Sequence, residues 1–128
     1  MSDKPVIEDA VCIVPVRDVR LSADFYCSTL DFDCRFISDD KSFAIIGQGD
    51  AVLHLVRAED EASLNATRHH ISVYLWVKNL DGLYKDLAPR LSELPESRVR
   101  QPFDQPYGMR EFHVKDLDGC LLLFGEEI

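Results

Sequence analysis

The sequence contains no apolar run close to the ~20 residues that a membrane-spanning helix needs. Residues 1–5, Met-Ser-Asp-Lys-Pro, lack the basic and then apolar pattern of a secretory signal peptide. These two absences lead us to expect a cytoplasmic protein that does not bind a membrane. The sequence also lacks a Cys-x-x-Cys pair, so we expect reduced, mostly buried thiols and no disulfide framework. The cysteines are Cys12, Cys27, Cys34 and Cys120.

Positive charge is scarce in this chain. Only 14 Lys and Arg residues stand against 23 Asp and Glu residues, and the formal net charge is −9. Binding to a phosphate backbone needs clustered Lys and Arg, so we expect no nucleic-acid partner. The acidic balance fits a cationic ligand, although solubility alone would also explain it. With 128 residues and 46% hydrophobic content, we expect one ordered domain over residues 1–128.

Residues 71–77 alternate strictly between two kinds of side chain, which predicts a β-strand. One face is aliphatic and suits packing under a helix; the other is aromatic and partly polar. The aliphatic face consists of Ile71, Val73, Leu75 and Val77, and the other face of Ser72, Tyr74 and Trp76. The second face could be the edge of a core or the floor of a ligand groove.

The rest of the chain divides into two similar halves. The patterns predict βαβββ in module one (residues 8–57), a polar connection (residues 58–69), and βαβββ again in module two (residues 70–126). Asp18 and Asn79 are predicted to cap the helix of each module. A further segment with two prolines, residues 102–108, is predicted to be a loop. Units of ~60 residues bury too little apolar surface to fold alone, so the modules must share a sheet or a partner.

Three segments of the chain match motifs of a known family. The first is residues 16–19 with Phe25-Tyr26 and residues 30–32, the second is residues 74–81, and the third is residues 105–112 with residues 116–119. In these segments the chain resembles the vicinal oxygen chelate superfamily, which includes glyoxalases, extradiol dioxygenases and bleomycin-resistance proteins. The third segment resembles the bleomycin-resistance branch in particular. This chain departs from the pattern at Asp31 (usually Gly), Tyr107 (usually Trp) and Leu117 (usually Pro).

The resemblance implies an α+β fold in which two βαβββ modules form curved half-barrels. It also implies a homodimer with ligand grooves at the interface of the two chains. Enzymes of the superfamily hold a divalent metal with one side chain on each of four strands. The corresponding positions here are Val11, His54, Ser72 and Leu123. One histidine cannot replace the three protein ligands of a catalytic metal site, so we expect no metal, no cofactor and no catalytic residue.

Without a metal, binding must rely on rings that stack on a flat ligand and attract a cationic group. The residues predicted to bind ligand are Asp33, Phe36, Phe43, His54, Tyr74, Trp76, Tyr107 and Met109. Each ring taken singly fits core packing as well, and His54 could simply be hydrogen-bonded inside the barrel. Glu111 and His113 share a strand face and could form an acid–base pair if that face lines the groove.

We therefore predict a metal-free, bleomycin-resistance-like homodimer that sequesters a small aromatic, cationic antibiotic. An alternative of a different class is a glyoxalase- or dioxygenase-like enzyme, a lyase or oxidoreductase, with an atypical metal site. A third possibility is a binding module for an unrelated metabolite.

Overall fold

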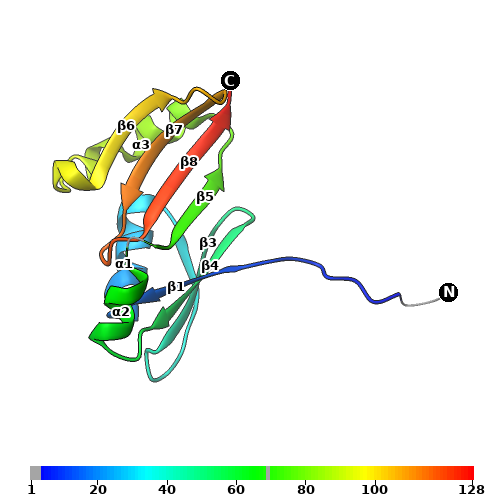
Figure 1. Cartoon of the computed structure of the whole chain (residues 1–128), viewed down its shortest axis with the longest axis vertical. Coiled ribbons are helices and arrows are strands. Elements are labelled where there is room, and N and C mark those ends of the chain that lie inside the picture. Colours follow the sequence, from blue (N-terminus) through cyan, green and yellow to red (C-terminus); the bar gives the residue numbers. More distant parts are fainter. Residues whose placement is uncertain (1–3, 69) are drawn as a thin grey trace.

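The computed structural model describes residues 4–68 and 70–128 (Figure 1). Residue 69, the last residue of the predicted connection, falls outside the described residues. Within that part of the chain, no helix is long and apolar enough to cross a membrane. Residues 4–11 are exposed and extend away from the two modules as the blue trace in Figure 1.

Module one is a four-stranded sheet, sheet A, with one helix. Its elements are β1 (Cys12–Val16), α1 (Val19–Leu30), β2 (Asp33–Ile37), β3 (Phe43–Gln48) and β4 (Ala51–Arg57). The strand order is β1-β4-β3-β2, with β1 parallel to β4 and the other pairs antiparallel.

Module two repeats this arrangement in sheet B. Its main elements are β5 (Ser72–Trp76), α3 (Leu80–Leu91), β6 (Val99–Asp104), β7 (Met109–Lys115) and β8 (Leu121–Glu127). The strand order is β5-β8-β7-β6, again with only the first pair parallel. A 3-10 turn, η1 (Glu96–Arg98), precedes β6, and α2 (Glu61–Thr67) lies in the connection. The prediction of an α+β fold made of two βαβββ modules is therefore confirmed.

The predicted loop over residues 102–108 was wrong for residues 102–104, which complete β6. The pairing of β6 with β7 shifts register between Arg100 and Phe103, and Pro102 lies in that irregularity. β6 is also the outer strand of sheet B. Proline is tolerated at such a position because its missing N–H removes no hydrogen bond of a central ladder.

Both predicted helix caps are present. The Asp18 carboxylate accepts a hydrogen bond from the Leu21 N–H at 3.0 Å, and the Asn79 amide oxygen accepts one from the Gly82 N–H at 3.2 Å. These bonds satisfy amides that the first helical turn leaves without partners. The side chains fix where α1 and α3 begin, and hence how each helix crosses its sheet.

Asp31 ends α1 in the left-handed conformation, with φ 64° and ψ 28°. Residues with a Cβ atom pay for this conformation, although Asp tolerates it better than most. We expect Asp31→Gly to raise the free energy of unfolding by about 1 kcal/mol, measured by urea denaturation followed by circular dichroism. As a control, Asp24→Gly inside the exposed face of α1 should lower it by about 1 kcal/mol. No gain for Asp31→Gly would contradict the assignment of strain to this residue.

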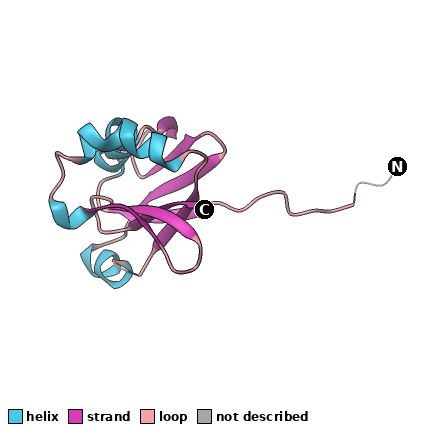
Figure 2. Ribbon diagram, turned by 90° about the horizontal axis from the view of Figure 1, so that it is seen from above, coloured by secondary structure: helices cyan, strands magenta, loops and turns pink. Residues whose placement is uncertain are grey.

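Each sheet is covered by helix on one face only. Figure 2 shows the helices gathered on one side of the strands. The covered face of sheet A carries Val14, Val16, Ala44, Ile46, Leu53 and Leu55, and that of sheet B carries Val73, Leu75, Phe112, Val114, Leu122 and Phe124. All of these side chains are buried in one core cluster with residues of α1 and α3. The opposite faces of the two sheets, which we call the open faces, are left without a helix.

A buried carboxylate in module two ties the modules together. The Tyr26 hydroxyl on α1 donates to Asp116 Oδ2 at 2.7 Å, and both side chains are buried. The other oxygen of Asp116 accepts from the N–H groups of Asp118 and Cys120, each at 2.9 Å. The turn between β7 and β8 is thereby held in shape and fixed against α1.

All four cysteines are free thiols, but the expectation that most are buried was wrong. Cys120 is buried, Cys12 and Cys27 are partly exposed, and Cys34 is exposed. Cys34 lies on β2, the outer strand of sheet A next to β3. An outer strand has a neighbour on one side only, so its side chains are less fully covered.

Candidate functional site

The open face of sheet A is apolar and carries three of the predicted ligand-binding residues. Strand pairing places Phe36, Ile45, His54 and Ile13 in one row across the four strands. Phe43 lies beside this row, with its ring centroid 6.1 Å from that of Phe36 and 5.1 Å from that of His54. The side chains of Ile13 and Phe36 are 59% and 51% exposed, so this row faces solvent within the single chain.

Asp33 lies beside this face, but its charge is already partnered. Arg35 Nε donates to Asp33 Oδ1 at 2.8 Å, and another nitrogen of the same guanidinium donates to the Gly49 carbonyl at 2.9 Å. The guanidinium packs so closely over Gly47 that a Cβ atom there would overlap it. The structure therefore presents Asp33 as half of an exposed ion pair, not as a free anion.

The open face of sheet B carries Tyr74 and Trp76 from β5, as the alternation of residues 71–77 predicts. Val73 and Leu75 are 7% and 8% exposed, whereas Tyr74 is 36% and Trp76 is 74% exposed. The two ring centroids lie 5.3 Å apart with the ring planes inclined by 55°. The two exposed rings form a continuous aromatic surface on this edge of sheet B.

A buried carboxylate lies at the centre of the same face. Glu111 on β7 is 0% exposed, and its two oxygens accept hydrogen bonds from four side chains. The donors are Tyr74 Oη at 2.8 Å, Tyr107 Oη at 2.5 Å, Gln105 Nε2 at 3.1 Å and His113 Nε2 at 2.8 Å. We call these five residues the Glu111 cluster. The cluster draws on β5, β7 and the turn between β6 and β7.

Gly125 on β8 makes the cluster possible. Strand pairing sets Gly125 directly opposite Glu111, while Tyr74 pairs with Leu123, two residues before Gly125 on β8. The Tyr74 phenol must therefore cross β8 to reach Glu111, and it does so over Gly125. A Cβ atom at residue 125 would overlap the Tyr74 hydroxyl. The hydrogen bond from Tyr74 to Glu111 therefore requires a residue without a side chain at position 125.

The cluster shifts the pKa values of its members in opposite directions. Burial alone would raise the pKa of Glu111, but the hydrogen bonds from Tyr107, His113, Gln105 and Tyr74 outweigh it and lower the pKa to about 2. Burial and the hydrogen bond to Glu111 raise the pKa of Tyr74 to about 12. The hydrogen bond to Glu111 is also the main reason that the pKa of Tyr107 is raised. At neutral pH the cluster holds an ionised carboxylate under two neutral phenols.

Other predicted residues take different places. Tyr107 lies in the turn after β6 and is 62% exposed, whereas Met109 is 8% exposed and offers little surface to a ligand. His113 does pair with Glu111, as considered from the sequence. However, the carboxylate is already bonded by three further donors, so the pair is not free to move a proton to a ligand. The roles of Gln105 and Gly125 have no signal in the sequence, because both depend on strand register.

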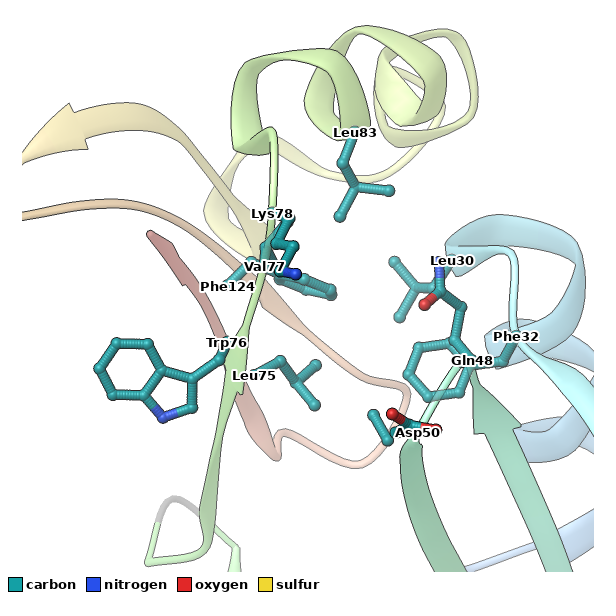
Figure 3. Close-up of a pocket in the computed structure, with 12 residues that line it drawn as sticks. Leu30, Phe32, Gln48, Asp50, Leu75, Trp76, Val77, Lys78, Leu83 and Phe124 are labelled. Carbon is teal, nitrogen blue, oxygen red and sulfur yellow. The ribbon is translucent and has the colours of Figure 1, made fainter. Parts of the chain in front are cut away.

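A cavity of about 480 Å³ lies elsewhere, between the two modules (Figure 3). Figure 3 shows Leu30, Phe32, Leu75 and Leu83 pointing into this space, while the Trp76 ring points away from it. Gln48, Asp50 and Lys78 also contribute to its lining. Of the eight side chains predicted to bind ligand, Trp76 is the one that borders this cavity. The other seven predicted residues do not line the space between the modules.

The four positions that would hold a superfamily metal do not fit one. Val11 and Leu123 have no donor atoms, Ser72 offers a weak hydroxyl, and His54 packs edge-on against Phe43. Among residues 4–68 and 70–128, no three His, Cys, Asp or Glu side chains come together in a way that could hold a metal ion. The side chains at these four positions therefore do not fit a divalent metal ion.

Known proteins share both the sequence pattern and the fold. The family model described as the Glyoxalase/Bleomycin resistance protein/Dioxygenase superfamily matches residues 10–124. The chain therefore belongs to this superfamily. Over 128 aligned residues it is 26% identical to a bleomycin resistance protein of Geobacillus stearothermophilus, which covers 90% of this chain and 93% of the relative.

Solved structures agree with this assignment. The bleomycin-binding protein of the bleomycin producer Streptomyces verticillus, solved with copper(II)-bleomycin, matches with a TM-score of 0.77 and 26% identity over 94% of this chain and 97% of that one. A lactoylglutathione lyase from Agrobacterium tumefaciens matches with a TM-score of 0.69 and 14% identity over 95% of each chain. The same fold thus occurs in a drug-binding protein and in an enzyme, so the function must be argued from the site.

Proposed function

We propose that this protein is a metal-free binding protein of the bleomycin-resistance type. It sequesters a small aromatic, cationic antibiotic in a groove between two copies of the chain, in the cytoplasm. Sequestration requires tight binding and no chemical step, so a protein of this kind needs neither a metal nor a catalytic residue. The likeness to bleomycin resistance proteins and to a bleomycin-binding protein supports the ligand class.

The observation that carries the proposal is that both sheets leave an aromatic face uncovered. Each sheet packs one face on a helix, and the opposite face carries rings: Phe36 and Phe43 on sheet A, Tyr74 and Trp76 on sheet B. Flat rings at such spacing can stack on a planar heteroaromatic ligand, at about 0.5–1.5 kcal/mol for each ring pair beyond area burial. Rings of this kind also attract a cationic group.

Exposed apolar surface supports the pairing of two chains. Ile13, Phe36 and Trp76 are all more than half exposed on the open faces. Val6 and Ile7, in the extended segment before β1, are 78% and 92% exposed. Large apolar side chains exposed to this extent are typical of an interface between proteins. A second copy would cover it and would enclose the aromatic faces as a groove.

A titration with bleomycin tests the proposed function. Trp76 is the only tryptophan in the sequence, so intrinsic fluorescence reports on the open face of sheet B. We expect metal-free bleomycin to change this fluorescence with a dissociation constant in the micromolar range or tighter, roughly −8 kcal/mol or better. The end point should correspond to one drug per chain, and sedimentation should give a dimer. Unchanged fluorescence at high micromolar drug would contradict the proposal.

The alternative of a glyoxalase- or dioxygenase-type enzyme makes the opposite prediction about metal. One divalent ion per chain, retained through purification without chelator and lost in His54→Ala, would favour that alternative. The Glu111–His113 pair is the observation that could support an enzyme. Its carboxylate is fully buried and bonded to four donors, and this arrangement suits a structural anchor better than a general base.

A further inference from the structure

We propose that Glu111 is a positioning residue that holds the phenol rings of Tyr74 and Tyr107 as two fixed walls of the ligand-binding face on sheet B. This inference rests on the proposed function and assigns the selection of a flat ligand to a residue that does not touch it. The carboxylate acts through the hydroxyl groups of the two phenols. The Tyr74 ring reaches it from β5, and the Tyr107 ring reaches it from the turn between β6 and β7.

Glu111 has no capacity left for a ligand. Oε2 accepts from the hydroxyls of Tyr74 and Tyr107, and Oε1 accepts from Gln105 and His113. The side chain is 0% exposed beneath these groups. A carboxylate that is buried and fully bonded cannot form an ion pair with an incoming cation without breaking one of these bonds.

The Tyr107 ring depends on Glu111 for its orientation. Tyr107 lies at the tip of a short turn, is 62% exposed and is followed by Gly108 at φ +86°. Gln105, at the start of the same turn, bonds to the same carboxylate. Backbone hydrogen bonds from the Gln105 N–H to the Met109 carbonyl at 2.7 Å and from the Ile128 N–H to the Gly108 carbonyl at 3.1 Å already hold the turn itself. The two side-chain bonds to Glu111 therefore fix the orientation of the exposed Tyr107 ring. Without them, the Tyr107 ring would have to be ordered each time a ligand binds, which lowers affinity.

The Tyr74 ring depends on the same carboxylate. Its hydroxyl reaches Glu111 only by crossing β8 above Gly125. This route lays the Tyr74 ring over β8, with its centroid 5.3 Å from that of Trp76. If the hydroxyl lost its acceptor, the ring could rotate away from β8 and change the surface that it forms with Trp76.

The test compares Glu111→Gln with Tyr107→Phe in the full-length protein. Glu111→Gln keeps the volume of the side chain and removes the ionised acceptor. Tyr107→Phe keeps the ring and removes only the hydroxyl, and because residue 107 is exposed this variant should fold even if Glu111→Gln does not. Tyr84→Phe, which removes a phenol hydroxyl on the helix-covered side of the same sheet, is the control. Fold is checked by circular dichroism.

Two readouts are needed, bleomycin affinity from Trp76 fluorescence and phenol ionisation from absorbance at 295 nm. We expect both Glu111→Gln and Tyr107→Phe to weaken bleomycin binding about ten-fold or more, with the effects of the double variant less than additive. In Glu111→Gln, the phenols of Tyr74 and Tyr107 should ionise closer to pH 10. The control should bind like wild type.

The outcomes separate this inference from the proposed function. Wild-type affinity in both variants, with phenol ionisation shifted in Glu111→Gln, would overturn the positioning role and leave the proposed function intact. A wild-type protein that binds no bleomycin would contradict the proposed function. In that case the pKa values of the phenols alone test the inference. Lower pKa values for Tyr74 and Tyr107 in Glu111→Gln would support the anchored walls, and unchanged pKa values would overturn them.

Discussion

Replacing Asp116 by alanine is expected to lower the free energy of unfolding by about 3–5 kcal/mol, because it leaves three donors without a partner. These are the buried Tyr26 hydroxyl and the N–H groups of Asp118 and Cys120. Urea denaturation followed by circular dichroism measures the loss. Leu117→Ala, in the same turn but at a side chain that is 48% exposed, is the matched control and should change stability by about 0.5 kcal/mol or less.

The effect of Asp116→Ala should also depend on pH. Burial raises the pKa of Asp116 above its usual range, although the hydrogen bonds from Tyr26 and the turn amides oppose this. The folded state therefore binds the proton more tightly than the unfolded state, and this contribution to stability is lost as pH rises from about 4 through the higher folded pKa. The stability difference between wild type and variant should shrink from pH 4 to pH 7. A difference that grows over that interval would contradict the raised pKa.

The second large effect is expected for Phe112→Ala, at about 3–5 kcal/mol of lost stability. Phe112 is 0% exposed, and its ring stacks on that of Phe124 with centroids 4.5 Å apart and planes inclined by 7°. The Tyr84 ring packs against it from α3 with centroids 5.1 Å apart. Removing the ring leaves a large cavity that these neighbours cannot close.

Trp76→Ala is the comparison for Phe112→Ala, because it removes a larger ring from the uncovered face of the same sheet. Trp76 is 74% exposed, so the variant should lose about 0.5 kcal/mol or less. Both variants can be measured by urea denaturation followed by circular dichroism. Similar losses in the two would mean that Trp76 is a core residue and that the two faces of sheet B are assigned wrongly.

Much of the fold could be predicted from the sequence because local signals agree with it. The alternation over residues 71–77 correctly separates the buried Val73 and Leu75 from the more exposed Tyr74 and Trp76. The capping residues Asp18 and Asn79 correctly predict where two helices begin. The end of β6 was missed, because proline normally argues against a strand. Here the register shift at Pro102 in an outer strand makes it acceptable.

The Glu111 cluster could not be predicted in the same way. Tyr74 and Glu111 are 37 residues apart and lie on strands separated by β8, so their contact depends on two strand registers at once. The sequence suggested only the short-range pair of Glu111 and His113, because strand periodicity relates those two directly. Periodicity tells which face a residue shares, but it does not tell which neighbour two strands away lies within reach.

The one-sided covering of each sheet has a consequence for how this protein can change over generations. Folding depends on the helix-covered sides, so substitutions among the exposed rings of Phe36, Trp76 and Tyr107 carry a small thermodynamic penalty. Selection can therefore alter the uncovered surface step by step while the scaffold persists. An architecture of this kind can acquire new surface chemistry without losing its fold.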